Sequence, residues 1–294
     1  MNPILLKPTE KTLIWGTEQW GISAHPNGDN IVLNPEYEGL SLSALWEKHP
    51  ELFGACKTKA FPLLTKIIDA RQDLSIQVHP DDEYASKNEN GSFGKTECWY
   101  IMDALPGTKI VIGHMAKNKS EVQSMIEKGE WTSFIREVPV HKGDFFFIEP
   151  GTVHAIKGGT VILETQQSSD ITYRVYDYNR LQNGKPRPLH VKQSIDVIKA
   201  PFENVKPPLN QQKSVSEDKN VKQLVSCPLF SVWHADVKKS VEFFQQDVFL
   251  LFSVINGSCT LENREFKKGE HFIIPCGKDK FNINGDAELI VSSV

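Results

Sequence analysis

Cysteine is scarce in this sequence, and its spacing matches no disulfide or metal framework. The 294 residues include five cysteines, an odd number, and no two of them form a Cys-x-x-Cys motif. Disulfide scaffolds and thiolate zinc sites need denser or paired cysteines. We therefore expect neither in this protein. The five cysteines are Cys56, Cys98, Cys227, Cys259 and Cys276.

Long apolar runs and a strong net charge are also missing. No apolar run approaches the ~18–20 residues that span a bilayer, and Lys7, Glu10 and Lys11 interrupt the stretch where a signal peptide keeps an apolar core. The formal net charge is −4, so no basic field points to nucleic acid or an anionic membrane. We expect a cytoplasmic protein without such partners, and the oligomeric state stays open. An anionic substrate would need a local cluster of Arg and Lys.

The composition that remains is that of an ordinary globular protein with many strands. Hydrophobic residues make up 39% and charged residues 24% of the chain, as in soluble domains. Residues 73–79 alternate as a strand, with Ser75, Gln77 and His79 on one face. Further strands are expected at 98–103, 108–113, 144–149, 160–165 and 171–176. Helices are expected at 41–53, broken or kinked near Pro50, at 119–136 and at 188–199.

A change of composition divides the chain near its last third. Residues 201–220 are rich in proline and polar residues, which predicts a linker or a long exposed loop. Residues 221–294 read as short strands, with turns at Asn256-Gly257 and Asn284-Gly285.

One segment before this boundary and one after it share a sequence pattern. Residues 142–156 and 268–282 both run Lys-Gly-acidic, then an apolar strand, then a Pro/Gly turn. This pattern predicts a second, degenerate β-roll built like the first. His154 lies three residues after the turn glycine of the first roll, whereas Lys280 has that place in the second. Because an ammonium has no lone pair for a metal, only the first roll is expected to hold one.

Four polar residues of the first roll have the chemistry of a metal site. Gln77 and His79 lie at i and i+2 of one predicted strand and share a face. Glu97 lies on the next strand-like segment, and His154 follows a Pro-Gly turn. Two imidazoles and one carboxylate suit Zn²⁺, and an amide oxygen can complete the set. The other histidines have no comparable partner pattern; they are His25, His49, His114, His141, His190, His234 and His271.

The order of these motifs resembles that of the type I mannose-6-phosphate isomerases, a family of cupins. The stretch at 20–28 resembles the short bacterial branch of that family. The resemblance is strong over roughly residues 1–200 and weak in the C-terminal roll. It departs from the usual cupin His-x-His pair, because Gln77 replaces the first histidine. The four segments are LSIQVHPDD (74–82), GKTECWY (94–100), EPGTVHAI (149–156) and SSDITYRVYD (168–177).

The resemblance implies a mostly β, double cupin fold of two jelly-roll barrels with small helical insertions. We expect a catalytic, metal-binding cupin domain with helical segments at 1–200. A linker or long loop follows at 201–220, and a degenerate, cupin-like β domain at 221–294.

The resemblance also implies a cofactor and a substrate. One Zn²⁺ per chain would serve the reversible conversion of mannose 6-phosphate into fructose 6-phosphate, so the partner is a small-molecule sugar phosphate. The implied zinc ligands are Gln77, His79, Glu97 and His154.

Four further side chains match residues of the family's active site. Arg174 aligns with the active-site arginine, and Asp170 aligns with an acidic residue near the reacting carbons. Lys95 matches the family's Lys-x-Glu pattern, and Ser75 matches a serine placed near the substrate phosphate. Three of them have an ordinary alternative: Lys95 as a surface lysine, Asp170 as a turn residue and Arg174 as half of an ion pair.

The phosphate ligand stays open at this stage. Larger family members carry a further lysine after the arginine, whereas this chain has the segment 176–190 there. Arg180, Lys185 and Arg187 are the candidates to replace that lysine.

Aldose–ketose isomerisation asks for such a set of groups. A proton moves between C1 and C2 through a cis-enediol, and a metal can stabilise the developing oxyanion. A base takes the proton and returns it to the neighbouring carbon. Lys95, Asp170 and His79 are the candidates for this proton transfer. Arg174, permanently cationic, suits charge stabilisation of the enediolate or the phosphate.

Three other functions compete with this prediction. A non-catalytic, sugar-binding cupin would keep the fold without turnover. A metal-dependent cupin oxygenase is disfavoured by Gln77, because such enzymes usually bind iron with more imidazole nitrogen. A metal-free sugar epimerase of the same fold would be unaffected by chelators.

Overall fold

The computed structural model describes residues 2–210, 213–245 and 247–294, and most of their regular secondary structure is strand. The chain divides into two compact units that interleave along the sequence. One comprises Met1–Glu10, Gln19–Ile67 and Pro207–Val294, and the other Lys11–Glu18 and Ile68–Lys206. The domain boundaries expected at 200 and 221 stay a prediction.

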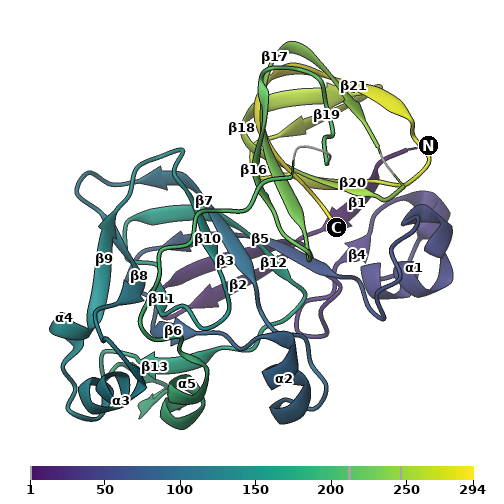
Figure 1. The fold of residues 1–294 in the computed structure, drawn as a ribbon. Coiled ribbons are helices and arrows are strands. Elements are labelled where there is room, and N and C mark those ends of the chain that lie inside the picture. Colours follow the sequence, from purple (N-terminus) through teal and green to yellow (C-terminus); the bar gives the residue numbers. More distant parts are fainter. Residues whose placement is uncertain (1, 211–212, 246) are drawn as a thin grey trace. The chain divides into compact units, whose positions relative to one another are not determined.

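The first unit is a large antiparallel sheet around an aromatic core. Its strands follow the order β16-β17-β21-β18-β20-β1-β4, with β19 paired to β18 (Figure 1). The N-terminal strand belongs here because Ile4 and Leu5 pair with Ile273 and Phe272. The strands are β1 (Ile4–Lys7), β4 (Ile31–Val32), β16 (Val221–Ser226), β17 (Ser231–Phe244), β18 (Leu250–Leu261), β19 (Arg264–Lys267), β20 (His271–Ile274) and β21 (Lys280–Ser293). The helices are η1 (Pro35–Tyr37), α1 (Leu42–Lys48) and η2 (Pro50–Leu52), so the expected break near Pro50 is confirmed.

The turns predicted at Asn256-Gly257 and Asn284-Gly285 are wrong. Both pairs lie inside long strands, β18 and β21, which run side by side. A Cβ on Gly257 would lie 2.1 Å from the Asp286 carbonyl oxygen, and one on Gly285 would lie 2.5 Å from that of Ser258. The pairing register also shifts between Val254 and Asn256. The glycines therefore allow the paired strands to approach closely beside a bulge, and both strands continue through these positions.

The segment 201–220 contains no helix or strand among its described residues. It is not exposed throughout, because Val215 is part of the buried core of the first unit. Ser216 is also buried, and its hydroxyl donates to the Glu242 carbonyl at 2.6 Å. Part of the predicted loop is thus held against the sheet.

The second unit contains a five-stranded sheet and most of a six-stranded sheet, three of whose strands have some of their residues in the first unit. The six-stranded sheet has the order β10-β7-β12-β5-β3-β2, and the five-stranded sheet the order β13-β6-β11-β8-β9. The first has β2 (Thr9–Leu13), β3 (Gly16–Ile22), β5 (Leu63–Ala70), β7 (Glu97–Ala104), β10 (Phe145–Ile148) and β12 (Thr160–Gln167). The second has β6 (Ile76–Val78), β8 (Lys109–His114), β9 (Ile135–Pro139), β11 (His154–Ala155) and β13 (Tyr173–Tyr176), and β14 (Leu181–Gln182) and β15 (Lys185–Pro186) form a separate hairpin.

Two apolar clusters set the direction of the side chains in the five-stranded sheet. One cluster lies between the sheets and includes Trp99, Ile112 and Ile162. The other includes Ile76 and Val78 of β6 together with residues of the helices α3 (Lys119–Glu127), α4 (Trp131–Phe134) and α5 (Val191–Val197) (Figure 1). Because side chains alternate along a strand, Gln77 points away from these helices and toward the other sheet.

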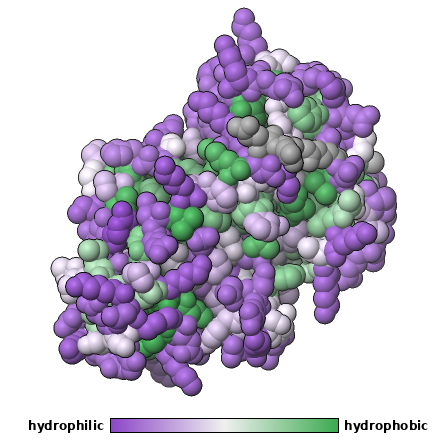
Figure 2. Space-filling model, in the orientation of Figure 1, coloured by the Kyte–Doolittle hydropathy of each residue, from purple (hydrophilic) through white to green (hydrophobic). Residues whose placement is uncertain are grey.

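The helix predicted over 119–136 is only partly correct. It is interrupted near Gly129, whose φ of +68° leaves the right-handed helical region, and residues from Ile135 onward form β9. The remaining helix, α2 (Asp82–Asn88), begins after Asp81, whose carboxylate accepts from the Tyr84 N–H. No helix among the described residues is long and apolar enough to cross a membrane. Figure 2 shows hydrophilic residues over much of the visible surface, with small hydrophobic patches between them.

Candidate metal centre and active site

Three of the sequence-predicted site residues lie side by side on neighbouring strands. His154 of β11 pairs with Gln77 of β6, and Gln77 pairs in turn with Arg174 of β13. Residues directly opposite each other in paired strands project from the same face of a sheet. The topology therefore brings together, on the inner face, residues that lie far apart in the sequence.

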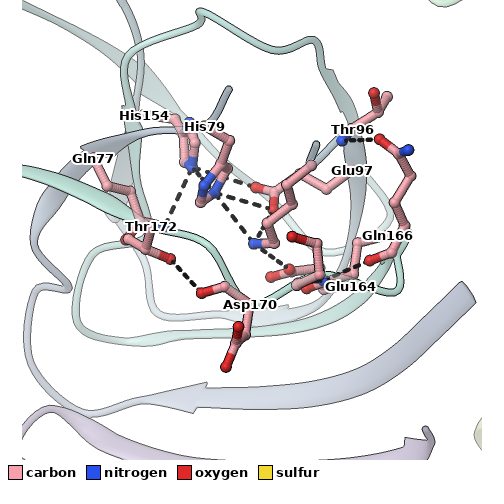
Figure 3. Close-up of polar contacts among 12 residues, drawn as sticks. Gln77, His79, Thr96, Glu97, His154, Glu164, Gln166, Asp170 and Thr172 are labelled. Atoms are coloured by element: carbon pink, nitrogen blue, oxygen red, sulfur yellow. Dashed lines mark hydrogen bonds and ion pairs between the residues drawn. The ribbon is translucent and has the colours of Figure 1, made fainter. Parts of the chain in front are cut away.

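His79 and Glu97 complete the cluster from two directions. His79 directly follows β6, and its carbonyl accepts from the Gly151 N–H at 2.9 Å. Glu97 opens β7 in the opposite sheet, where it pairs with Ile148. Ligand atoms of His79, Glu97 and His154 all lie within 4.8 Å of one another, and all three side chains are buried. These three predicted ligands are thus assembled at one place (Figure 3).

The two imidazoles present their Nε2 atoms to the centre of this cluster. His79 Nδ1 lies 2.8 Å from the Ile171 carbonyl, and His154 Nδ1 lies 2.9 Å from the Thr152 carbonyl. Because a carbonyl only accepts, each Nδ1 carries the proton and each Nε2 of the neutral ring has a lone pair. The two Nε2 atoms are 3.1 Å apart, and each lies 3.4 Å from a Glu97 oxygen. This orientation of histidines by carbonyls is typical of metal sites.

The pKa shifts favour the protonation states that metal ligands need. Burial, together with the neighbouring Lys95 ammonium, lowers the pKa of His79 to about 3. Burial also lowers the pKa of His154. For Glu97, burial acts to raise the pKa, but the Lys95 ammonium holds it well below its usual range. At neutral pH the cluster therefore has two neutral imidazoles and one carboxylate.

The donor set fits a cation. Glu97 Oε1 is buried and accepts no hydrogen bond from any described residue. Gln77 adds an amide, whose Nε2 lies 3.2 Å from His154 Nε2. Because the two amide atoms exchange places on rotation, the oxygen can occupy the same position. Two nitrogen lone pairs, a carboxylate and an amide oxygen can thus converge on one ion.

Lys95 lies directly beside the cluster, in a buried network with two glutamates. Its Nζ is 2.5 Å from Glu97 Oε2, 3.1 Å from Glu164 Oε1 and 3.2 Å from His79 Nε2. Lys95 is 4% exposed and Glu164 2%, so both charges depend on this pairing. We did not predict Glu164 from the sequence. An acid within the apolar strand TVILET was the available signal.

Arg174 is half-buried on the face shared with Gln77. Burial lowers its pKa, and the Arg187 guanidinium lowers it further, so the two cations lie within electrostatic reach of each other. Arg187 binds Asp177 through two contacts of 2.6 and 2.7 Å, and Arg180 binds the same carboxylate at 2.5 Å. Lys185, the third candidate phosphate ligand, is exposed on β15.

Two predicted residues differ in how close they come to the cluster. Ser75 is buried, and its hydroxyl lies 3.5 Å from the Gln77 amide oxygen. Asp170 is exposed, and its carbonyl, not its carboxylate, accepts from Thr172 at 3.4 Å. In Figure 3 the Asp170 carboxylate points away from His79 and Glu97.

In the second roll, Lys280 has the position that corresponds to His154 of the first roll. Lys280 is exposed, and its Nζ forms an ion pair with Glu242 at 2.7 Å. The ammonium therefore has an ordinary surface role there. Among the described residues, one cluster of metal-ligating side chains is found, and it consists of His79, Glu97 and His154, outside this roll.

Comparison with known proteins gives two family models that match this chain. The model "Phosphomannose isomerase type I, catalytic domain" matches residues 7–103. The model "Mannose-6-phosphate isomerase, cupin domain" matches residues 220–294. Together with the strand content, these matches confirm the prediction of a mostly β, double cupin fold.

Relatives that match over most of this chain are named mannose-6-phosphate isomerase. The chain is 46% identical to mannose-6-phosphate isomerase ManA of Bacillus subtilis (strain 168), over 99% of this chain and 98% of that protein. It is 45% identical to mannose-6-phosphate isomerase of Streptococcus mutans serotype c, over 94% and 87% of the two chains. A crystal structure of the mannose 6-phosphate isomerase from Bacillus subtilis superposes with a TM-score of 0.93, at 41% identity and 100% coverage of both chains.

Proposed function

The chain belongs to the type I mannose-6-phosphate isomerase family, and we propose that it interconverts mannose 6-phosphate and fructose 6-phosphate. The observation that carries this proposal is the placement of Arg174 in register with Gln77, which pairs in turn with His154 of the His79–Glu97–His154 cluster. A metal-binding cluster next to a permanent cation is what an enediolate intermediate needs.

We propose Zn²⁺ as the metal, one ion per chain, held by Gln77, His79, Glu97 and His154. The chemistry of the donors supports zinc, because imidazole and carboxylate are its common ligands in catalytic sites. When bound, the ion would polarise a substrate oxygen as a Lewis acid. The carbonyls of Ile171 and Thr152 support this role by holding both rings with Nε2 directed inward.

The geometry favours Lys95 among the three candidates for proton transfer. His79 is engaged at both ring nitrogens when it serves as a ligand, and the Asp170 carboxylate is turned away from the cluster. Lys95 Nζ contacts both Glu97 and Glu164, so a proton at Nζ has carboxylate partners on two sides. We propose that Lys95 and Glu164 together hold the proton that is exchanged with the sugar.

We propose Arg187 as the cation that binds the substrate phosphate. Two contacts with Asp177 fix the orientation of the Arg187 guanidinium. The positive charge of Arg187 lowers the pKa of Arg174, so it lies near that side chain. Arg180 shares the Asp177 carboxylate and also donates to the Asp73 carbonyl. A cytoplasmic location and the lack of nucleic-acid and membrane partners stay predictions.

A coupled assay with mannose 6-phosphate, run before and after metal removal, tests the function. We expect turnover in both directions, loss of turnover with a chelator, and recovery on adding Zn²⁺. Metal analysis of the purified protein runs in parallel. Absence of turnover would favour the sugar-binding cupin, chelator resistance would favour the epimerase, and bound iron with oxygen consumption would favour the oxygenase.

A further inference from the structure

Arg174 lies on an edge strand, and one residue satisfies its main chain on the open side. β13 is the first strand of the five-stranded sheet, with β6 as its neighbour in the sheet order. The Arg174 N–H donates to His190 Nδ1 at 3.2 Å, and the Arg174 carbonyl accepts from the His190 N–H at 2.8 Å. On an open edge such groups are otherwise left to solvent. His190 therefore takes the place of a neighbouring strand at Arg174, because it pairs both main-chain groups of that residue.

His190 is itself held by α5. It is the N-cap residue of this helix, and its carbonyl accepts from both the N–H and the hydroxyl of Ser194 at 2.8 Å. At the other end of α5, Lys119 Nζ donates to the carbonyls of Ile195 and Asp196 at 2.8 and 2.9 Å. The ring thus projects from an anchored helix end and not from a free loop.

We propose that His190 is a positioning residue for the reaction. Its Nδ1 lone pair holds the Arg174 main chain, and thereby keeps the guanidinium on the face of the sheet that Gln77 shares. The inference rests on the proposed isomerase function, in which Arg174 meets the anionic substrate. It gives a role to a histidine that had no recognisable partner in the sequence.

The contact requires a neutral ring. Nδ1 accepts the Arg174 N–H only without a proton, so the ring proton is on Nε2. The groups that face the ring are Arg174, Tyr173, at 6.0 Å between ring centroids, and Glu89, which follows α2. Burial lowers the pKa of His190, Arg174 lowers it further and Glu89 acts in the opposite direction. The contact is therefore complete near pH 7 and is lost as the pH falls below the ordinary histidine range.

Two substitutions separate the acceptor from the bulk of the ring. His190→Leu removes the acceptor, whereas His190→Asn places an amide oxygen at the same bond separation as Nδ1 and does not titrate. On folded, zinc-loaded protein we expect His190→Leu to lower kcat about tenfold with a smaller change in KM, as for a donor left without its partner. His190→Asn should stay within about threefold of the wild type.

A pH series and a spectrum add readouts that a purely structural role would not move. As the pH falls from about 7.5 to about 5, the ratio of kcat for His190→Asn to that of the wild type should rise, because only the wild type loses its acceptor. The ¹⁵N shifts of the His190 ring should be those of an Nε2-protonated tautomer. His141→Asn is the matched control, because the His141 side chain is 80% exposed, and its kcat should not change.

The outcomes separate this inference from the function on which it rests. Wild-type kcat in His190→Leu, an equal loss in His190→Asn, or an Nδ1-protonated ring would each overturn the positioning role. If His190→Leu does not fold, His190→Asn and its pH ratio still decide. Absence of turnover in the wild type would overturn the proposed function instead, while the ring spectrum would still decide the Nδ1 contact.

Discussion

Arg174→Ala is expected to lower kcat by on the order of 10²-fold or more, with a much smaller rise in KM. Removing one group that stabilises an oxyanion typically costs about 3–4 kcal/mol in the transition state. If Arg174 acts on the enediolate, this loss affects the transition state more than the bound sugar. Steady-state kinetics on folded, zinc-loaded enzyme measure the division between kcat and KM.

The position of Arg174 makes such an effect large. The side chain is half-buried on the face shared with Gln77, so its charge is partly shielded from water. Although burial and Arg187 lower its pKa, a guanidinium stays cationic at any working pH. Arg174→Lys should not restore full activity, because a point-like ammonium cannot reproduce the planar fork.

Arg136→Ala is the matched control for Arg174→Ala. Arg136 lies on β9 at the opposite edge of the same sheet, where it donates to the Ile112 carbonyl at 3.2 Å. We expect this variant to lose some stability and to keep its kcat. A rise in KM alone for Arg174→Ala would mean that Arg174 binds only the phosphate. A lower melting temperature with nearly intact activity would mean a structural ion pair, and the catalytic interpretation would end.

Which residues of segment 73–79 face the site could be predicted, because side chains alternate between the two faces of a strand. Ile76 and Val78 pack under the helices, so Gln77 must face the other way, as the period of the segment indicated. The same local reasoning failed at Asn256-Gly257. An Asn-Gly pair is a turn signal, but whether the chain turns or only bulges depends on the partner strand, here β21.

Residues that depend on distant partners were the ones that the sequence did not single out. Glu164 has its counter-charge on Lys95, and only the position of β12 beside β7 brings the two together. His190 contacts the main chain of Arg174 and not a side chain, so no pattern of residue types could indicate it. Asp170 was identified by resemblance alone, and the resemblance says nothing about its carboxylate, which points away from His79 and Glu97 in Figure 3.

His154→Ala is expected to abolish metal binding and turnover while the protein stays folded. Its Nε2 lies 3.1 Å from His79 Nε2 and 3.4 Å from Glu97 Oε1, so its loss opens one side of the ligand set. Even residues that only orient metal ligands cost about 10–100-fold in affinity when they are removed, and loss of a ligand itself should cost at least as much. Zinc content after dialysis, measured together with kcat, checks this.

The fold should survive because the apolar clusters on both sides of the sheet remain. Trp99 and Ile112 pack between the sheets, while Val78 and Phe134 of α4 belong to the cluster between the five-stranded sheet and the helices. Near-ultraviolet circular dichroism reports this packing directly. His141→Ala, an exposed histidine of the same unit, is the control and should keep both metal and activity. Full zinc occupancy in His154→Ala would show that His154 is not a ligand. A metal bound by side chains of residues 221–294 would contradict the expectation that the second roll, with Lys280 at the corresponding position, holds none.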